Sequence, residues 1–157
     1  VILIIILGII SVIISISISD INSTRLNSAA RRLASDIRYA QQLAMTKQIR
    51  HGIVFTVPNT YTVIQENDPN PDTPARNPAG GGNLIVDYNS DPQLQGVTIS
   101  APSFCVGAIC TQTLEFNSLG VPTDAAGTPL TSGSVILSYS GNSKTLTVIP
   151  NTGKLTY

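Results

Sequence analysis

The sequence predicts an α+β protein in which a long N-terminal α-helix packs on a small antiparallel β-sheet head. The first nineteen residues, VILIIILGIISVIISISIS, carry no charge, and the first charged residue is Asp20. Apolar residues then recur with helical spacing to about residue 50, after which short β-like runs alternate with Gly- and Pro-containing turns. These observations divide the chain into an apolar helix segment (1–19), an amphipathic helix (20–50) and a β-rich head (51–157).

The apolar segment 1–19 is long enough to cross a bilayer. At about 1.5 Å per residue, such a helix spans roughly 28 Å, close to the hydrocarbon thickness of a membrane. A signal peptide is disfavoured because no basic residue precedes the run and no small-residue cleavage site follows it. Two alternatives remain: a simple membrane anchor, or a helix that leaves the bilayer and packs against copies of itself. The Ile/Ser alternation of residues 14–19 marks the place where this helix is expected to loosen.

The segment 20–50 has the spacing of an amphipathic helix whose apolar stripe packs on the head. The stripe is rich in alanine, which permits a close approach by whatever covers it. Lys47 and Arg50 are placed favourably at the C-terminal end, and Gly52 is a suitable residue to stop the helix. The residues predicted to make the helix–head contact are Leu26, Ala30, Leu33, Ile37, Ala40 and Ala44.

The remaining residues, 51–157, predict an antiparallel β-domain. The runs 51–57 and 60–66, joined by Pro58-Asn59, are typical of a β-hairpin. The four prolines and three consecutive glycines of residues 67–82 predict a loop. Further strands are expected at 84–88, 97–100, 113–116, 135–139, 145–149 and 154–157, with turn residues between them.

The charges are unevenly distributed, although the formal net charge is zero. The stretch 20–50 has a net charge of +4, and the rest of the chain has −4. A basic helix and an acidic head suit contacts between the helix of one copy and the head of another. The alternative is an ordinary solvated helix face. Nucleic-acid binding is not favoured, because the head holds only three basic residues, Arg76, Lys144 and Lys154.

The two cysteines, Cys105 and Cys110, are separated only by VGAI. On the exported side of a membrane segment, two cysteines so close together favour a local disulfide over two free thiols. The loop-entropy model assigns such a bond roughly 2 kcal/mol of stabilisation. A metal site would need further ligands, and the sole histidine is distant in sequence.

The sequence offers no convincing catalytic or metal-binding set, and we expect no enzyme. His51 is the one candidate base, and its place between helix and first strand indicates a capping or packing residue. The carboxylates that could be imagined as calcium ligands match no EF-hand spacing and are expected to be solvated; they are Asp68, Asp72, Asp87 and Asp91. The five tyrosines show no stacking pattern that would indicate electron transfer.

An apolar helix that continues as an amphipathic one and leads into a β-rich head resembles type IV pilins and pseudopilins. The block AARRLASDIRYAQQLA (29–44), followed by RHGIVF (50–55), is similar to the GspH/FimT-type members, in which an ASDLRYARQLA-like helix leads to an R-x-G-V-x-F strand. LEFNSLG (114–120) and VIPNTG (148–153) resemble that family's F-x-x-x-G and P-x-T-G segments. Such proteins begin with a Phe-led stretch that contains a glutamate. That stretch is absent here, and we expect Val1 to correspond to the residue just beyond the glutamate.

The resemblance implies the pilin fold and a structural subunit of a type IV pilus-like extracellular filament. The subunit would wait in the inner membrane and then polymerise with copies of itself, helped by a pilus or secretion assembly machinery, with no cofactor. Two alternatives stay open: a pseudopilin of a type II secretion system, and a minor pilin that binds DNA for uptake. The residues expected to pack in the filament core are Val1, Leu3, Ile6, Leu7, Gly8, Ile10, Ile13 and Ile14.

Overall fold

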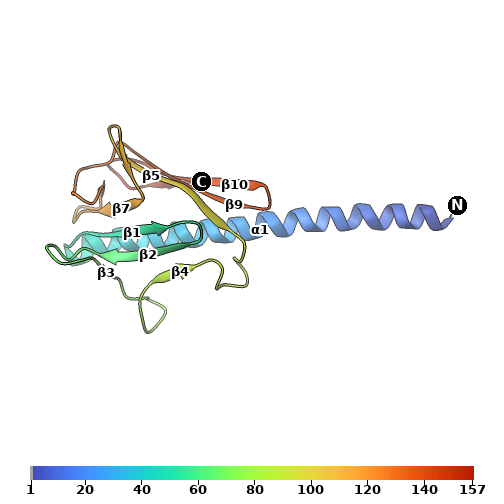
Figure 1. Ribbon diagram of the computed structural model, residues 1–157, viewed down its shortest axis with the longest axis horizontal. Helices are drawn as coiled ribbons and strands as arrows, with labels where there is room; N and C mark the ends of the chain where they lie inside the picture. The colour runs from blue at the N-terminus through green and yellow to red at the C-terminus, as the bar shows by residue number, and fades with distance from the viewer. Residues whose placement is uncertain (1) are drawn as a thin grey trace.

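The computed structural model describes the backbone of residues 2–157 and the side chains of residues 22–157. Over this backbone, α1 (Ile2–Lys47) is followed by eleven strands. Figure 1 shows that the C-terminal part of α1 lies alongside the strands, while its N-terminal part projects away from them. The strands and their connections therefore form a head at one end of the helix.

Six of the strands form one antiparallel sheet with the order β3-β2-β1-β7-β8, in which β4 also pairs with β2. In this sheet, Gly52 of the central strand is paired with Ile64 on one side and Glu115 on the other. The strands are β1 (His51–Thr56), β2 (Thr60–Gln65), β3 (Thr73–Pro74), β4 (Ile85–Asp87), β7 (Thr113–Phe116) and β8 (Pro122–Thr123).

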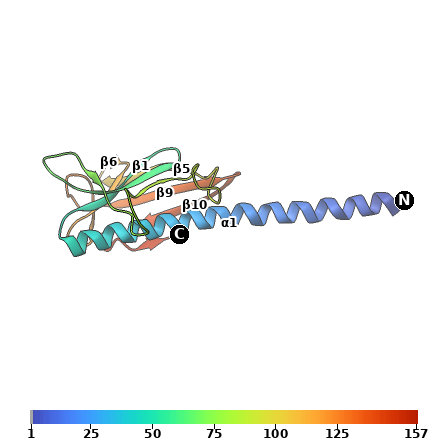
Figure 2. The same cartoon turned by 90° about the horizontal axis from the view of Figure 1, so that it is seen from below.

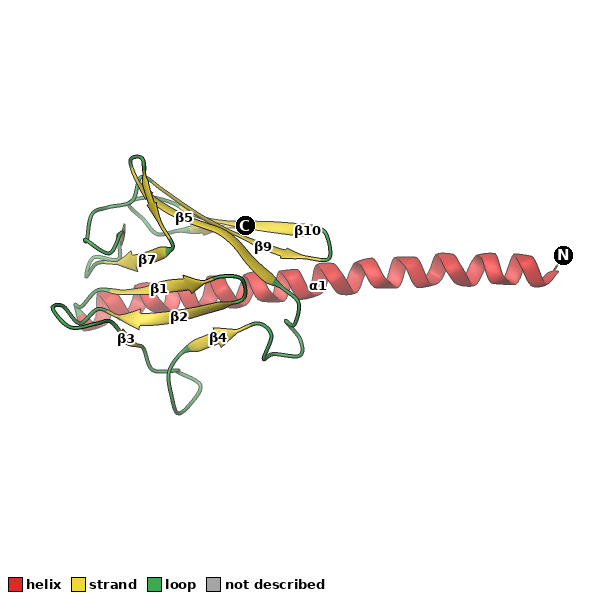
Figure 3. Ribbon diagram, in the orientation of Figure 1, coloured by secondary structure: helices red, strands yellow, loops and turns green. Residues whose placement is uncertain are grey.

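The other five strands form a second antiparallel sheet with the order β11-β10-β9-β5-β6. The register between β5 and β9 shifts between Ser100 and Ser103, where Ala101 has a φ of 45°. Figure 3 shows the strands of both sheets on the same stretch of α1. The strands are β5 (Thr98–Val106), β6 (Ile109–Thr111), β9 (Ser132–Tyr139), β10 (Asn142–Val148) and β11 (Leu155–Thr156).

The core lies between α1 and the two sheets. Figure 2 shows α1 along one side of the head with the strands on the other. The helix packs on β1, β2 and β7 of the first sheet and on β9 and β10 of the second. Phe55 of β1 stacks on Phe104 of β5 with ring centroids 5.6 Å apart, which joins the two sheets. The fully buried alanines allow the helix backbone to approach closely; they are Ala29, Ala30, Ala34, Ala40 and Ala44.

The predicted fold class, a long helix packed on a small sheet, is wrong. The chain has two antiparallel sheets and about 40% strand, so it is mostly β. By comparison, the helix with described side chains is short and covers residues 22–47. The physical reason is that a helix buries only a stripe, whereas each sheet buries a whole face. The predicted runs were assigned to one sheet because strand patterns do not reveal which strands pair.

The helix ends earlier than predicted, at Lys47. Gln48 follows with a φ of 57°, the left-handed conformation that commonly terminates a helix. The prediction that Gly52 stops the helix is therefore wrong, since Gly52 lies within β1. A glycine is required at this position because the neighbouring strand lies close: an added Cβ would lie 2.7 Å from Cγ of Glu115.

Three short strands fall where turns or loops were expected or no strand was assigned. β3 lies inside the predicted loop 67–82, β8 begins at the end of a predicted turn, and β6 forms the second half of a hairpin with β5. Strands of two or three residues carry no period that a sequence can show, because their pairing is decided by the longer neighbour.

The predicted membrane-crossing segment lies outside the residues with described side chains. Within residues 22–157, no helix is long and apolar enough to span a membrane. The predicted filament-core residues also fall outside that part of the chain; they are Val1, Leu3, Ile6, Leu7, Gly8, Ile10, Ile13 and Ile14.

Candidate functional site

A cluster of charged side chains surrounds Arg50, which lies between α1 and β1. Its guanidinium forms an ion pair with Glu66 and contacts Asp68, with 3.2 Å between Nη2 and Oδ2. Nη1 also donates a hydrogen bond of 3.2 Å to the carbonyl oxygen of Ala125. The Arg50 side chain is 19% exposed, so these contacts are partly shielded from water. Arg50 therefore ties the loops after β2 and β8 to the helix–sheet junction.

Glu115 of β7 is the most deeply buried carboxylate of this cluster. Its side chain is 2% exposed, and Oε2 lies 3.8 Å from Nε of Arg50 without a hydrogen bond. Thr123, its partner on β8, is also buried, and its Oγ1 has no partner among the described residues. Burial raises the pKa of Glu115 to about 7, although Arg50 opposes the shift. The carboxylates that raise this pKa further are Asp72, Asp124 and Asp68.

Sequence reasoning missed this cluster. In the run Thr113–Phe116, a glutamate between apolar residues indicates a side chain directed toward solvent. Gly52 was the available signal, because a glycine in a strand often marks the close approach of another group. Because Gly52 also suits the end of a helix, the sequence alone does not assign Glu115 as its neighbour.

His51 is fully buried on the opposite face of β1. Its Nδ1 donates a hydrogen bond of 2.8 Å to the carbonyl oxygen of Ile49, while Nε2 has no partner among the described residues. Burial lowers the pKa of His51, so the imidazole is neutral at pH 7. Nδ1 is thus engaged by a backbone carbonyl oxygen at the junction of α1 and β1.

A second polar group joins α1 to the head. The hydroxyl of Tyr61 donates a hydrogen bond of 2.7 Å to Oδ2 of Asp36, and the hydroxyl of Tyr88 donates one of 3.3 Å to the carbonyl oxygen of Ala29. The two tyrosine rings meet edge to face with centroids 5.9 Å apart. Burial raises the pKa of Asp36 and of both tyrosines. These contacts fix the rotation of the helix on the first sheet.

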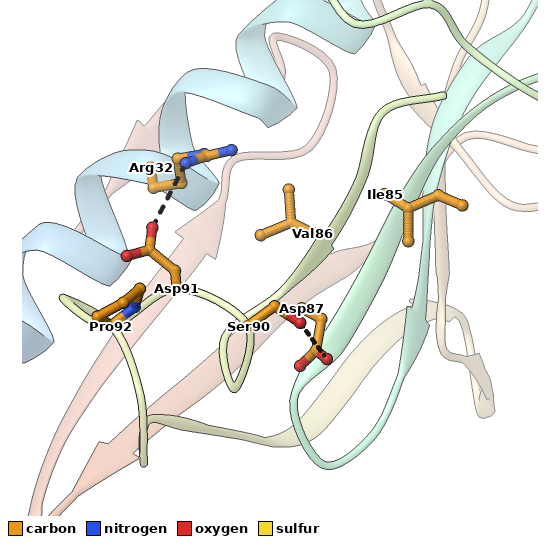
Figure 4. Close-up of a pocket in the computed structure, with 7 residues that line it drawn as sticks. All are labelled: Arg32, Ile85, Val86, Asp87, Ser90, Asp91 and Pro92. Atoms are coloured by element: carbon orange, nitrogen blue, oxygen red, sulfur yellow. Dashed lines mark hydrogen bonds and ion pairs between the residues drawn. The ribbon is translucent and has the colours of Figure 1, made fainter. Parts of the chain in front are cut away.

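An open groove of about 310 Å³ lies between α1 and the segment around β4. Figure 4 shows Arg32 and Asp91 facing each other across it, with 3.9 Å between Nη1 and Oδ2. Asp87 accepts a hydrogen bond of 3.0 Å from the hydroxyl of Ser90. The polar groups of the groove are thus engaged with one another. The lining residues are Arg32, Ile85, Val86, Asp87, Ser90, Asp91 and Pro92.

The imagined calcium ligands fall into two separate places. Asp87 and Asp91 lie at the groove beside α1, whereas Asp68 and Asp72 belong to the surroundings of Arg50 and Glu115. Within residues 22–157, no group of three or more His, Cys, Asp or Glu side chains is arranged to hold a metal ion.

The remaining tyrosines are dispersed over the head. Tyr39 donates a hydrogen bond of 3.3 Å to the carbonyl oxygen of Arg76. Arg25 lies 5.7 Å from the ring centroid of Tyr139, and Lys144 lies 5.0 Å from that of Tyr157. The first contact joins α1 to β9, and the second joins β10 to the last residue of the chain.

The disulfide between Cys105 and Cys110 is confirmed. It joins directly paired residues of β5 and β6, so it closes the hairpin at the edge of the second sheet. Ile109, at the start of β6, is 76% exposed. The bond therefore holds the mostly exposed strand β6 against β5, whose Phe104 belongs to the core.

The residues predicted for helix–head packing all face the head. Each has a relative exposure of 5% or less, and the structure adds Ala29 and Ala34 to the same buried stripe. Together, the side chains of this stripe form the helix surface that packs on both sheets. The predicted residues are Leu26, Ala30, Leu33, Ile37, Ala40 and Ala44.

Comparisons with protein-family models, with curated proteins and with solved structures found no match.

Proposed function

We propose that this chain is a structural subunit of a pilus-like extracellular filament and polymerises through its N-terminal apolar helix. Before assembly, residues 1–19 are held in the inner membrane. After assembly, the corresponding helices of neighbouring copies replace the lipid around them. A contact of this kind is head-to-tail and leaves an unsatisfied end on each new copy, so the product is an open fibre.

The observation that carries the proposal is the position of the uncharged segment. The backbone of α1 continues beyond the head, and the stretch that projects contains residues 2–19 of the uncharged run. At about 25 cal/mol per Å² of buried apolar area, covering such a helix releases many kcal/mol. The head of the same chain does not reach this segment, so its cover comes from lipid or from another copy.

The similarity of residues 29–55 to GspH/FimT-type pilins supports the same function. That block supplies the buried stripe of α1 and the central strand β1, together with Arg50 at the junction. A rigid connection between helix and head suits a subunit whose position in a fibre is set through its helix. The proposal is independent of the fold class that was predicted for the head.

The test is fibre formation by the purified full-length chain on removal of detergent, observed by negative-stain electron microscopy. The wild-type chain is expected to form fibres. Ile10→Glu places a charge in the apolar segment and should abolish them, because a buried unpaired carboxylate is costly. Ala79→Glu, in the exposed loop before Gly80, is the matched control and should polymerise normally. Absence of wild-type fibres, or fibres from Ile10→Glu, would contradict the proposal.

A further inference from the structure

The exposed side of α1 carries two arginines without a described partner. Arg31 and Arg38 are both exposed, and their spacing of seven residues places them on the same side of the helix. No ion pair or hydrogen bond joins either guanidinium to another of residues 22–157, whereas the neighbouring Arg32 is paired with Asp36 and Asp91. Figure 2 shows α1 on the outside of the head, so this side of the helix is open to another molecule.

The opposite charge is concentrated at the C-terminal end of the helix, on the loops around Arg50. We call Asp68, Asp72 and Asp124 the acidic loop surface. Asp68 has a side chain that is 79% exposed, and Asp72 is also exposed. Arg50 is already shared between Glu66 and Asp68, so the surface retains an excess of negative charge.

Two buried polar groups lie close to this surface and have unpartnered oxygen atoms among the described residues. The Oε2 atom of Glu115 and the Oγ1 atom of Thr123 lack hydrogen-bond partners, although both side chains are at least 98% buried. All three carboxylates of the acidic loop surface also raise the pKa of Glu115. Additional positive charge at this place would therefore be favourable.

We propose that Arg31 and Arg38 of one copy bind the acidic loop surface of a second copy. The argument is charge complementarity: an unpaired basic helix side and an acidic surface lie on the same chain, too far apart along α1 to meet within it. The inference rests on the proposed filament function and specifies the contact that sets the register between neighbours. Charged pairs at an interface contribute chiefly to orientation and partner choice.

The contact implies a definite displacement between the two copies. The acidic loop surface lies near Arg50, just past the C-terminal end of α1 at Lys47, and Arg31 and Arg38 lie nine to sixteen residues before Lys47. At about 1.5 Å per residue, the second copy is displaced by roughly 14–24 Å along the axis. Repetition of the same displacement adds further copies without closing a ring, which gives a fibre.

The experiment compares charge-reversal variants of the full-length chain in the fibre assay, with the rate followed by light scattering. Arg31→Glu combined with Arg38→Glu should slow assembly at least tenfold, and so should Asp68→Lys combined with Asp72→Lys. The chain that carries all four substitutions should regain most of the wild-type rate, because each interface again joins opposite charges. Wild-type assembly should also slow as salt rises, since the Debye length is about 8 Å at physiological ionic strength.

The matched control reverses two basic residues of the head, Arg76→Glu with Lys154→Glu, and should assemble at nearly the wild-type rate. All substituted positions are exposed, and thermal unfolding in detergent verifies that each variant is folded. If the wild type forms fibres and both double reversals assemble normally, or the fourfold variant is not rescued, this inference is wrong and the filament function stands. If the wild type forms no fibres, both are wrong.

Discussion

Glu115 occupies a position where burial and charge oppose each other. Its carboxyl lies over Gly52, close to Arg50 but without a hydrogen bond on Oε2. Burial disfavours the ionised form, and its pKa rises to about 7 from the ordinary 4.5. The folded chain therefore binds a proton at Glu115 more tightly than the unfolded chain does.

This difference predicts a pH-dependent stability. The contribution of Glu115 is fully present below about pH 4.5 and is lost as the pH rises through 7, because the unfolded carboxyl ionises first. Through this group the wild type should lose on the order of 3 kcal/mol of stability between pH 4.5 and pH 8, and Glu115→Gln should remove that decline. Urea unfolding of both proteins at a series of pH values measures how the free energy of unfolding changes with pH.

Asp91→Asn provides the control for Glu115→Gln, since Asp91 lies at the groove beside α1 and away from Arg50. It should leave the slope between pH 5 and pH 8 unchanged. An unchanged slope in Glu115→Gln would show that the carboxyl titrates normally in the folded protein.

At the scale of elements, α1 is held on the head by three kinds of contact. An apolar stripe is buried against both sheets, and Tyr61 donates a hydrogen bond to Asp36. Nε2 of Gln41 also donates to the carbonyl oxygens of Gly120 and Thr152, at 2.8 and 3.0 Å. The helix thus connects segments from the middle and the end of the chain.

Because the stripe is mostly alanine, its few large residues should carry much of the packing energy. Leu33→Ala removes a fully buried side chain and should lower the free energy of unfolding by about 2–5 kcal/mol. Gln42→Ala, at an exposed position of the same helix, should change it by less than about 0.5 kcal/mol. Chemical denaturation followed by circular dichroism distinguishes the two. Equal effects would mean that α1 does not stabilise the head through its apolar stripe.

At the scale of the whole molecule, the described core begins at Leu26. The buried apolar residues extend from there to Leu155 and link the helix with both sheets. We therefore expect the head, together with the part of α1 packed on it, to hold its structure without the projecting part of the helix.

A chain that starts at Asn22 is expected to fold as a monomer in the absence of detergent. Its thermal transition should be cooperative and lie within a few degrees of that of the full-length chain, because it retains the described core. Circular dichroism and analytical ultracentrifugation measure both properties. A disordered spectrum would mean that residues before Asn22 contribute to the core.

The sequence by itself determined the features that depend on local pattern. The helical spacing from Leu26 to Ala44 identified the buried stripe, since side chains three and four positions apart share a helix face. The hairpin of β1 and β2 followed from alternation and turn residues. The Cys105–Cys110 bond followed from two cysteines close in sequence.

Only the tertiary structure decided what depends on residues distant in sequence. The division into two sheets, and with it the mostly β character, comes from pairing between strands such as β5 and β9. The cluster of Arg50 with Glu66, Asp68 and Glu115 combines three separate segments, and the role of Gly52 appears only when β7 lies beside β1. Local periodicity reports which side of an element is buried, but the partner is chosen by packing across the whole chain.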